Sequence, residues 1–288
     1  MKIDKPVLRR EVTRIDNPPV LAGHVVGHTL RRLIDGRHTA FTDPFVLLAE
    51  DWMPRGAFPP HPHRGMETVT FVIEGAVEHR DSAGHRGVIR SGDAQWMTAG
   101  RGLEHEENAQ KGVIAHTLQL WVNLPSAQKM TAPRYQDLVG ADMPVRREPG
   151  VEIRVFSGQS AGVTSPTLNH TPVIMIDARI EPGASFLQSL PASDNAFVHV
   201  LSGVARVGAT GDIVRANQLA WLSRSDETEA SELVLAAGDA PVRLLLFSGR
   251  PLREPVVFGG PFVMNTQSEI GQAFADYHAG RFGSVEPA

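Results

Sequence analysis

Two stretches of the chain, 128 residues apart, carry the same sequence features in the same order. In each stretch an apolar run ends at a glycine, Gly75 or Gly203, and a tryptophan follows. Trp96 lies 21 residues after the first glycine, and Trp221 lies 18 residues after the second. This separation is much longer than the period of a solenoid repeat, so we interpret it as duplication of a whole domain. A chain of 288 residues has room for two such domains.

Short apolar segments separated by turns make up most of each copy. Residues 68–77 are rich in β-branched and aromatic side chains, and residues 114–122 alternate between two faces, as strands do. The 27 glycines and 21 prolines favour frequent turns over long helices. Many short strands with turn signals between them are typical of sandwiches and barrels. We therefore expect an all-β fold of two β-barrels.

The segment between the two copies suggests where one domain ends. Residues 137–152 hold two prolines and two glycines, a composition suited to a linker. We expect an N-terminal barrel over residues 1–136 and a C-terminal barrel over residues 137–288.

Helices are expected at two places only. Thr266 and Glu269 form a capping-box pattern at the start of an amphipathic segment, and Gly280 is a suitable stop. This helix is expected to pack on the outside of the C-terminal barrel. A short helix is expected from Ser126 to Met130.

The chain has twelve histidines and no cysteine. Without cysteine there is no thiolate nucleophile and no iron–sulfur cluster, so a metal site must use nitrogen and oxygen ligands. The net charge of −4 gives no general attraction to nucleic acid or anionic membranes, and we expect no direct nucleic-acid binding. No stretch approaches the roughly 20 apolar residues of a membrane span, and no secretory signal is evident. We expect a cytoplasmic protein.

His61, Pro62 and His63 give the strongest local signal of a metal site. In an extended segment, residues two apart project to the same face, so both imidazoles can reach one ion. Pro62 favours the extended conformation at His61. A His-x-His pair alone is weak evidence in a chain with twelve histidines. Its support is a second cluster about forty residues on, where His105 lies among three glutamates.

The carboxylate of this site can come from either cluster. Glu67 follows the His-Pro-His segment by four residues, and Glu107 follows His105 by two. On a strand, Glu104 and Glu106 would point away from His105, whereas Glu107 shares its face. Alternation therefore selects Glu107 within its own cluster, and Glu67 remains the alternative.

The order of these residues resembles the cupin motifs. The first cupin motif has two histidines, a glutamate and a later glycine, which correspond to His61, His63, Glu67 and Gly75. The second motif corresponds loosely to Gly92 and His105, and Thr98 stands where proline is usual.

The departures from that general pattern point to one cupin family. Three segments resemble the pirins: residues 61–107, which begin HPHRGMETV and end GRGLEHEE, 119–125 (QLWVNLP) and 253–266 (REPVVFGGPFVMNT). The resemblance runs from about residue 10 to residue 280. It implies two stacked, jelly-roll-like cupin barrels, with one iron in the N-terminal barrel and no metal in the other. The pirin metal ligands, carried over residue by residue, fall on His61, His63, His105 and Glu107. The resemblance therefore favours Glu107 over Glu67.

The second copy supports a C-terminal barrel without a metal. In the first copy the expected ligands lie at fixed spacings from Gly75 and Trp96. The same spacings from Gly203 and Trp221 lead in the second copy to Ser189, Pro191, Ala230 and Glu232. Only one of these four side chains is a carboxylate, and none is a histidine.

Three imidazoles and one carboxylate suit Fe(II), and also Mn, Ni, Cu or Zn. Four protein ligands leave one or two positions open on the ion, where substrate and dioxygen can bind. The resemblance implies a metal-dependent dioxygenase of the quercetin 2,3-dioxygenase kind, which opens a flavonol ring and releases carbon monoxide. Glu107 is the candidate base for the flavonol 3-hydroxyl proton.

A non-enzymatic, iron-binding regulator is the alternative function. Some pirins act through contact with transcription factors or metabolic enzymes, and the same four ligands serve both functions. A substrate-sized cavity opening on the metal would favour the enzyme, and a site plugged by side chains would favour the regulator. The expected partners are a small aromatic substrate such as a flavonol together with dioxygen, or another protein. The resemblance suggests a monomer.

The other histidines and the tryptophans are given structural roles. His79 and His85 flank a charged hairpin and are expected to be solvated. His116 lies on an apolar strand face and is expected to be buried and hydrogen-bonded. Trp96 and Trp121 are expected to belong to the core.

Overall fold

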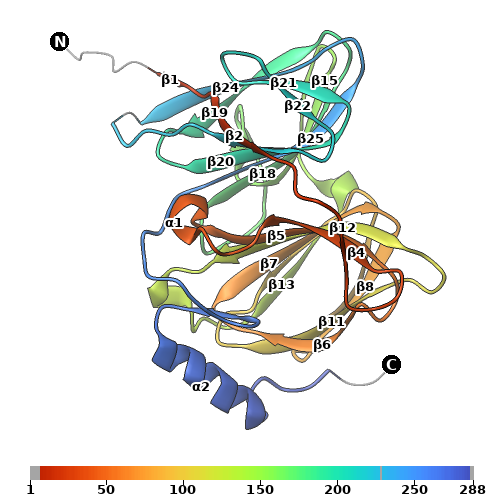
Figure 1. The fold of residues 1–288 in the computed structure, drawn as a ribbon, viewed down its shortest axis with the longest axis vertical. Helices are drawn as coiled ribbons and strands as arrows, with labels where there is room; N and C mark the ends of the chain where they lie inside the picture. Colours follow the sequence, from red (N-terminus) through yellow and green to blue (C-terminus); the bar gives the residue numbers. More distant parts are fainter. Residues whose placement is uncertain (1–6, 228, 286–288) are drawn as a thin grey trace. The chain divides into compact units, whose positions relative to one another are not determined.

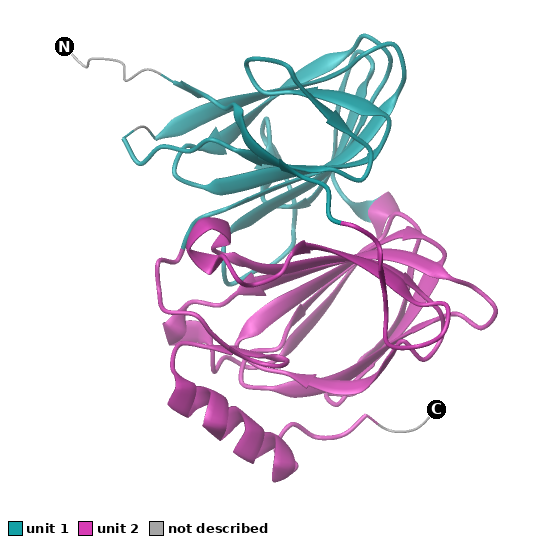
Figure 2. Cartoon of the chain, viewed as in Figure 1, with its two compact units in different colours: residues 1–18, 142–251 teal, residues 19–141, 252–288 magenta. Residues whose placement is uncertain are grey.

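The computed structural model describes residues 7–227 and 229–285, which fold into two compact units. One unit comprises residues 19–141 and 252–288, and we name it the N-terminal barrel. The other comprises residues 1–18 and 142–251, and we name it the C-terminal barrel (Figure 2). Both units are built almost entirely from β-strands, as expected (Figure 1).

The N-terminal barrel is formed by two antiparallel sheets. The larger sheet has the strand order β13-β10-β7-β12-β5-β4-β3, and the smaller one β6-β11-β8-β9. The larger sheet contains β3 (Leu21–Ala22), β4 (Thr29–Ile34), β5 (Phe45–Met53), β7 (Met66–Glu74), β10 (Ala94–Thr98), β12 (Ala115–Asn123) and β13 (Arg134–Leu138). The smaller sheet contains β6 (Phe58–His63), β8 (Ala76–Asp81), β9 (Arg86–Arg90) and β11 (Leu103–Ala109).

The C-terminal barrel repeats this arrangement. Its larger sheet has the order β14-β15-β18-β25-β20-β23-β2, and in its smaller sheet β24 pairs with β1, β19 and β21, which in turn pairs with β22. The larger sheet contains β2 (Val12–Asp16), β14 (Val145–Glu148), β15 (Val151–Ser157), β18 (Val173–Ile180), β20 (Asn195–Ser202), β23 (Leu219–Leu222) and β25 (Val242–Gly249). The smaller sheet contains β1 (Leu8–Arg9), β19 (Ser185–Pro191), β21 (Val204–Val207), β22 (Asp212–Arg215) and β24 (Ala230–Ala237).

The strand orders confirm the duplication. The order β6-β11-β8-β9 in one barrel corresponds to β19-β24-β21-β22 in the other. The two repeat glycines follow equivalent strands, β7 and β20, and both have a φ of 82°. A Cβ atom at Gly203 would lie 2.3 Å from the carbonyl oxygen of Pro241, so this turn has no room for a side chain.

Each end of the chain belongs to the barrel that is formed mainly by the other half of the chain. This differs from the expected division at residue 136. At the N-terminus, β2 pairs with β23 and so belongs to the C-terminal barrel. At the C-terminus, the ribbon of β26 (Val257–Gly259) and β27 (Phe262–Met264) and the helix that follows it belong to the N-terminal barrel. Edge strands leave backbone groups to pair, and sequence distance does not decide which segment pairs with them. The expected linker contains η2 (Gly140–Asp142) and β14.

The C-terminal helix has the predicted cap. Helix α2 (Gln267–His278) begins after Thr266, whose side chain accepts from the backbone N–H of Glu269, and the Glu269 carboxylate accepts from the backbone N–H of Thr266. Its buried Ile270 and Ala273 pack against Phe262 rather than on the C-terminal barrel. The segment expected to be helical from Ser126 is a single 3-10 turn, η1 (Ser126–Gln128). The described residues contain no helix long and apolar enough to cross a membrane.

Three short elements complete the described part of the chain. They are α1 (Thr39–Thr42) and the ribbon strands β16 (Gln159–Ser160) and β17 (Val163–Thr164).

The interiors of the two barrels differ in polarity. The C-terminal barrel is filled by a continuous cluster of apolar side chains from both of its sheets. In the N-terminal barrel the apolar cluster around Val72 and Val77 is small, and buried polar side chains lie near it, among them His63, Thr70 and Glu107. Buried polar groups need partners, so this interior is where a functional site is expected.

Candidate metal centre

Strands β6 and β11 bring the two predicted clusters together. They pair antiparallel, with His61 directly opposite His105 (Figure 1). His63 lies two residues beyond His61, and its ring is also directed towards His105, as the alternation of an extended segment predicts. The ring centroids are 4.4 Å apart for His61 and His105, 4.8 Å for His61 and His63, and 4.9 Å for His63 and His105.

The three histidines each present one nitrogen to a common point. These three nitrogen atoms all lie within 4.8 Å of one another. In His61 the other ring nitrogen, Nδ1, lies 2.8 Å from the carbonyl oxygen of Pro59, and in His63 it lies 3.1 Å from that of Pro261. A carbonyl oxygen can only accept, so both Nδ1 atoms carry the proton and both Nε2 atoms have a free lone pair. This is the usual arrangement of metal-binding histidines.

Burial keeps the imidazoles of His63 and His105 neutral. Burial lowers the pKa of His63 well below its ordinary value, with a further contribution from nearby His61. Burial also lowers the pKa of His105 well below the ordinary value, and His61, His63 and His79 add to the effect. Neutral imidazole is the form that binds a metal ion.

The buried nitrogens fit a metal ion. Nε2 of His63 and both ring nitrogens of His105 have no hydrogen-bond partner among the described residues. Buried polar atoms are almost always paired, so unpartnered nitrogens on two adjacent buried histidines are the expected signature of a metal-binding group. Nitrogen donors of this kind suit first-row transition metals.

Glu107 lies on β11 on the same face as His105, as alternation predicts. Its side chain is buried, and each of its oxygens accepts one hydrogen bond: Oε1 from Thr70 Oγ1 at 2.7 Å, and Oε2 from Gln119 Nε2 at 2.6 Å. A carboxylate oxygen of Glu107 lies within 4.8 Å of a nitrogen of His105 and of His79. Glu107 therefore adjoins the three histidines through His105.

Glu67 has different partners. It is fully buried on β7, where Oε1 accepts from Thr98 Oγ1 at 2.7 Å and lies 3.7 Å from Nη2 of Arg134. Within the described ranges it belongs to neither group of side chains placed to share a metal ion. These contacts agree with the structural role that the sequence allowed for it.

A cavity of about 540 Å³ opens on the histidines. His61 and His63 form part of its wall, together with the aromatic side chains of Phe58, Trp121 and Phe258. The Trp121 ring meets His63 edge-on, with centroids 5.1 Å apart. Trp121 is thus only partly buried and faces the cavity, whereas Trp96 is fully buried in the core, as expected.

Two family models match the chain in sequence. One is described as Pirin and covers residues 30–122, and the other is described as the pirin C-terminal cupin domain and covers residues 175–283. The chain belongs to the pirin family. Both of its barrels are accordingly cupin domains, and the predicted fold class is confirmed.

Two solved structures and a curated relative each match most of the chain. The crystal structure of GK1651 from Geobacillus kaustophilus is 45% identical, has a TM-score of 0.84, and covers 87% of this chain and 100% of that one. A structure named quercetin 2,3-dioxygenase from Acinetobacter baumannii is 33% identical, has a TM-score of 0.84, and covers 97% of this chain and 100% of that one. A pirin-like protein of Solanum lycopersicum is 41% identical over 268 residues, which cover 89% of this chain and 88% of the relative.

In this pirin, strand register assigns different equivalents in the C-terminal barrel from those reached by counting. The pairing of Val207 with Leu235 corresponds to that of His79 with Glu107. Continuing through β24 and β19, the positions of the four expected ligands are occupied by Gln188, Leu190, Leu233 and Leu235. Ser189 and Ala230, reached by counting, point outward, because counting misses the register equivalents by one residue on β19 and by three on β24, both odd numbers. Three of the four positions hold leucine, which has no donor atom.

His79 is the residue that sequence reasoning placed wrongly. It is buried rather than solvated, and its ring lies beside that of His105, with centroids 5.3 Å apart. The signal was present in the sequence: Val77, His79 and Asp81 alternate along β8, so they share the inward face. His85, in contrast, is partly exposed and contacts Asp81.

His116 has the hydrogen-bonded role expected of it. Its Nε2 lies 2.8 Å from Oε1 of Glu50, and its ring stacks on Trp52 with centroids 4.4 Å apart. Its side chain is partly rather than fully buried.

Proposed function

We propose that the chain is a metal-dependent dioxygenase that opens flavonols such as quercetin with release of carbon monoxide. The observation that carries the proposal is the cavity of about 540 Å³ lined by His61 and His63. Its volume is typical of small-molecule sites, which usually measure about 300–1,000 Å³. A cavity that reaches the metal-binding side chains supports an enzyme, whereas a plugged site would have favoured a regulator. The Acinetobacter relative carries the name of the proposed activity.

The metal is proposed to be one Fe(II) ion held by His61, His63, His105 and Glu107. Three neutral nitrogens and one carboxylate also suit Mn, Ni, Cu and Zn, so supply decides which ion is loaded. The bound ion would supply Lewis acidity, which makes the 3-hydroxyl of a flavonol easier to deprotonate.

The chain's own residues would orient the substrate and take its proton. Phe58, Trp121 and Phe258 offer flat apolar surfaces to the rings of an aromatic substrate. Glu107 is the proposed acceptor of the 3-hydroxyl proton, because it is a buried carboxylate beside His105 and its hydrogen-bond partner Gln119 lines the cavity. Thr70 and Gln119 hold both of its oxygens and so fix its orientation.

The proposal is tested by metal analysis followed by an anaerobic titration with quercetin and then by addition of oxygen. We expect a shift of the flavonol absorption band on binding, and oxygen uptake with carbon monoxide release in the second step. His61→Ala should lose turnover, whereas the exposed His278→Ala should retain it. Oxygen consumption with quercetin at the wild-type rate in His61→Ala would refute the proposal.

A further inference from the structure

Both ring nitrogens of His79 and both of His105 lack a hydrogen-bond partner within the described part of the chain. Both side chains are buried, with 1% and 0% of their surface exposed. An ion bound with His61 and His63 takes one nitrogen of His105 and none of His79. A metal ion bound by His61, His63 and His105 therefore does not account for the unpartnered nitrogens of His79.

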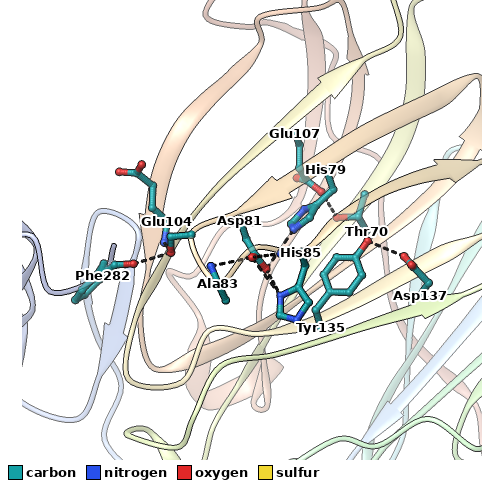
Figure 3. A network of polar contacts seen from close by, with 11 residues as sticks. Thr70, His79, Asp81, Ala83, His85, Glu104, Glu107, Tyr135, Asp137 and Phe282 are labelled. Atoms are coloured by element: carbon teal, nitrogen blue, oxygen red, sulfur yellow. Dashed lines mark hydrogen bonds and ion pairs between the residues drawn. The ribbon is translucent and has the colours of Figure 1, made fainter. Parts of the chain in front are cut away.

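The register between β8 and β11 places His79 next to a carboxylate. His79 lies directly opposite Glu107, and Asp81 lies directly opposite His105. One ligand atom from each of His79, His105 and Glu107 lies within 4.8 Å of the other two. All three side chains are buried, and Figure 3 shows His79 and Glu107 side by side. Two imidazoles and one glutamate form a donor set that proteins use for Zn and for Fe(II).

The neighbours of these side chains hold them in place. Oδ2 of Asp81 lies 3.8 Å from Nε2 of His79, beyond hydrogen-bonding distance, and so places a carboxylate beside the imidazole. Asp81 itself is fixed by the ring of His85 at 2.9 Å and by the backbone N–H of Ala83 at 2.9 Å. Glu107 is held by Thr70 and Gln119, which hydrogen-bond to its two oxygens.

We propose that His79, His105 and Glu107 form an inner binding position for a divalent transition-metal ion. It shares His105 and Glu107 with the metal centre proposed above, whose other ligands are His61 and His63 and which we name the outer position. An ion held by His105 and Glu107 therefore has two alternative sets of further partners, His79 or the pair His61 and His63. The cavity wall includes His61 and His63 but none of the inner three residues. An ion in the inner position is therefore withdrawn from the cavity. The inference rests on the proposed metal centre and adds His79 to it.

The test removes the outer position and measures what remains. The double variant His61→Ala/His63→Ala is titrated with Co²⁺ and followed by calorimetry and by the visible absorption of the bound ion. We expect one equivalent of Co²⁺ to bind. Adding His79→Gln should weaken that binding by at least about tenfold, because a ligand is lost. The control adds His278→Gln instead, which changes an exposed histidine at the end of α2 and should leave the affinity within about twofold.

Two outcomes would overturn the inner position. One is a folded double variant that binds no Co²⁺, and the other is an affinity that His79→Gln leaves unchanged. Circular dichroism and thermal unfolding show whether each variant is folded. His79→Asn serves as a second variant if His79→Gln is not. Failure of the inner position leaves quercetin turnover by the wild-type protein untouched, so it is distinguishable from failure of the proposed function.

Discussion

His61 and His105 lie directly opposite each other on β6 and β11, with their ring centroids 4.4 Å apart. Residues opposite each other in an antiparallel pair have their Cβ atoms about 4.5–5.5 Å apart, which is close enough for two imidazoles to share an ion. A slip of one residue would turn the ring of His105 to the other face of the sheet. The candidate centre thus depends on the register of these two strands.

His63→Ala should lower the affinity for a divalent metal by at least about 100-fold, because it removes a buried nitrogen donor from the three-histidine group. Competition with a chelator, followed by metal analysis of the recovered protein, measures the change. His278→Ala is the control, since His278 is exposed at the end of α2. Equal metal retention by the two variants would contradict the assignment.

Gln119→Leu should lower metal affinity or turnover by about 10- to 100-fold, because Gln119 donates a 2.6 Å hydrogen bond to Glu107 and fixes its orientation. Thr70→Val removes the bond to the other oxygen and should act in the same direction. The spectrum of the Co²⁺-loaded protein should change in both variants. An unchanged spectrum would show that the orientation of Glu107 does not influence the ion.

Arg10→Leu should lower the free energy of unfolding by about 3 kcal/mol. The buried guanidinium donates to Ser231 Oγ at 2.8 Å and to the carbonyl oxygens of Asp194 and Ser223 at 2.9 and 2.5 Å. Burial lowers the pKa of Arg10 to about 10, so it is charged at neutral pH. Urea unfolding measures the effect, and the exposed Arg9→Leu should change stability by less than about 0.5 kcal/mol.

Because Lys129 is buried, we expect the protein to be more stable in mildly alkaline solution than at neutral pH. Its ammonium group donates to Gly65 O, Val263 O and Asn123 Oδ1, yet burial lowers its pKa from 10.5 to about 8. The folded chain releases this proton before the unfolded chain does, so the unfolded state binds more protons between these two pH values. Stability contributed by Lys129 therefore rises from about pH 8 to about pH 10.5, by roughly 3 kcal/mol in total.

Urea unfolding at pH 7.5 and at pH 10.5 tests this dependence. Between these two pH values the free energy of unfolding should rise more for the wild-type protein than for Lys129→Met, by most of the roughly 3 kcal/mol. The variant has no proton to release at this position. The control variant Lys111→Met, at an exposed lysine, should retain the wild-type gain. The prediction would be contradicted if the free energy of unfolding of Lys129→Met rose with pH as much as that of the wild-type protein.

Local patterns were sufficient for much of this protein. The repeated glycines and tryptophans indicated two barrels, and the capping box at Thr266 indicated α2. Alternation placed Glu107 on the face of His105 because the side-chain period of a strand is two and needs no tertiary information. The same rule applied to β8 would have directed His79 inward. The charged residues around His79 suggested a solvated hairpin instead, and the barrel interior proved polar enough to accept it.

Sequence alone determined the fold class, the family resemblance and the cluster of His61, His63 and His105. Only the tertiary structure decided which segments complete each barrel, because free sheet edges pair with whatever strand reaches them, and β2 reaches β23. It also decided that His79 lies beside His105 and Glu107, and that the second copy has leucine at three of the four positions of the candidate ligands. Each of these depends on register between strands that are distant in the chain. When an alignment is wrong by an odd number of residues, it assigns inward-pointing side chains to positions that point outward. Counting along the sequence does not reveal such an offset.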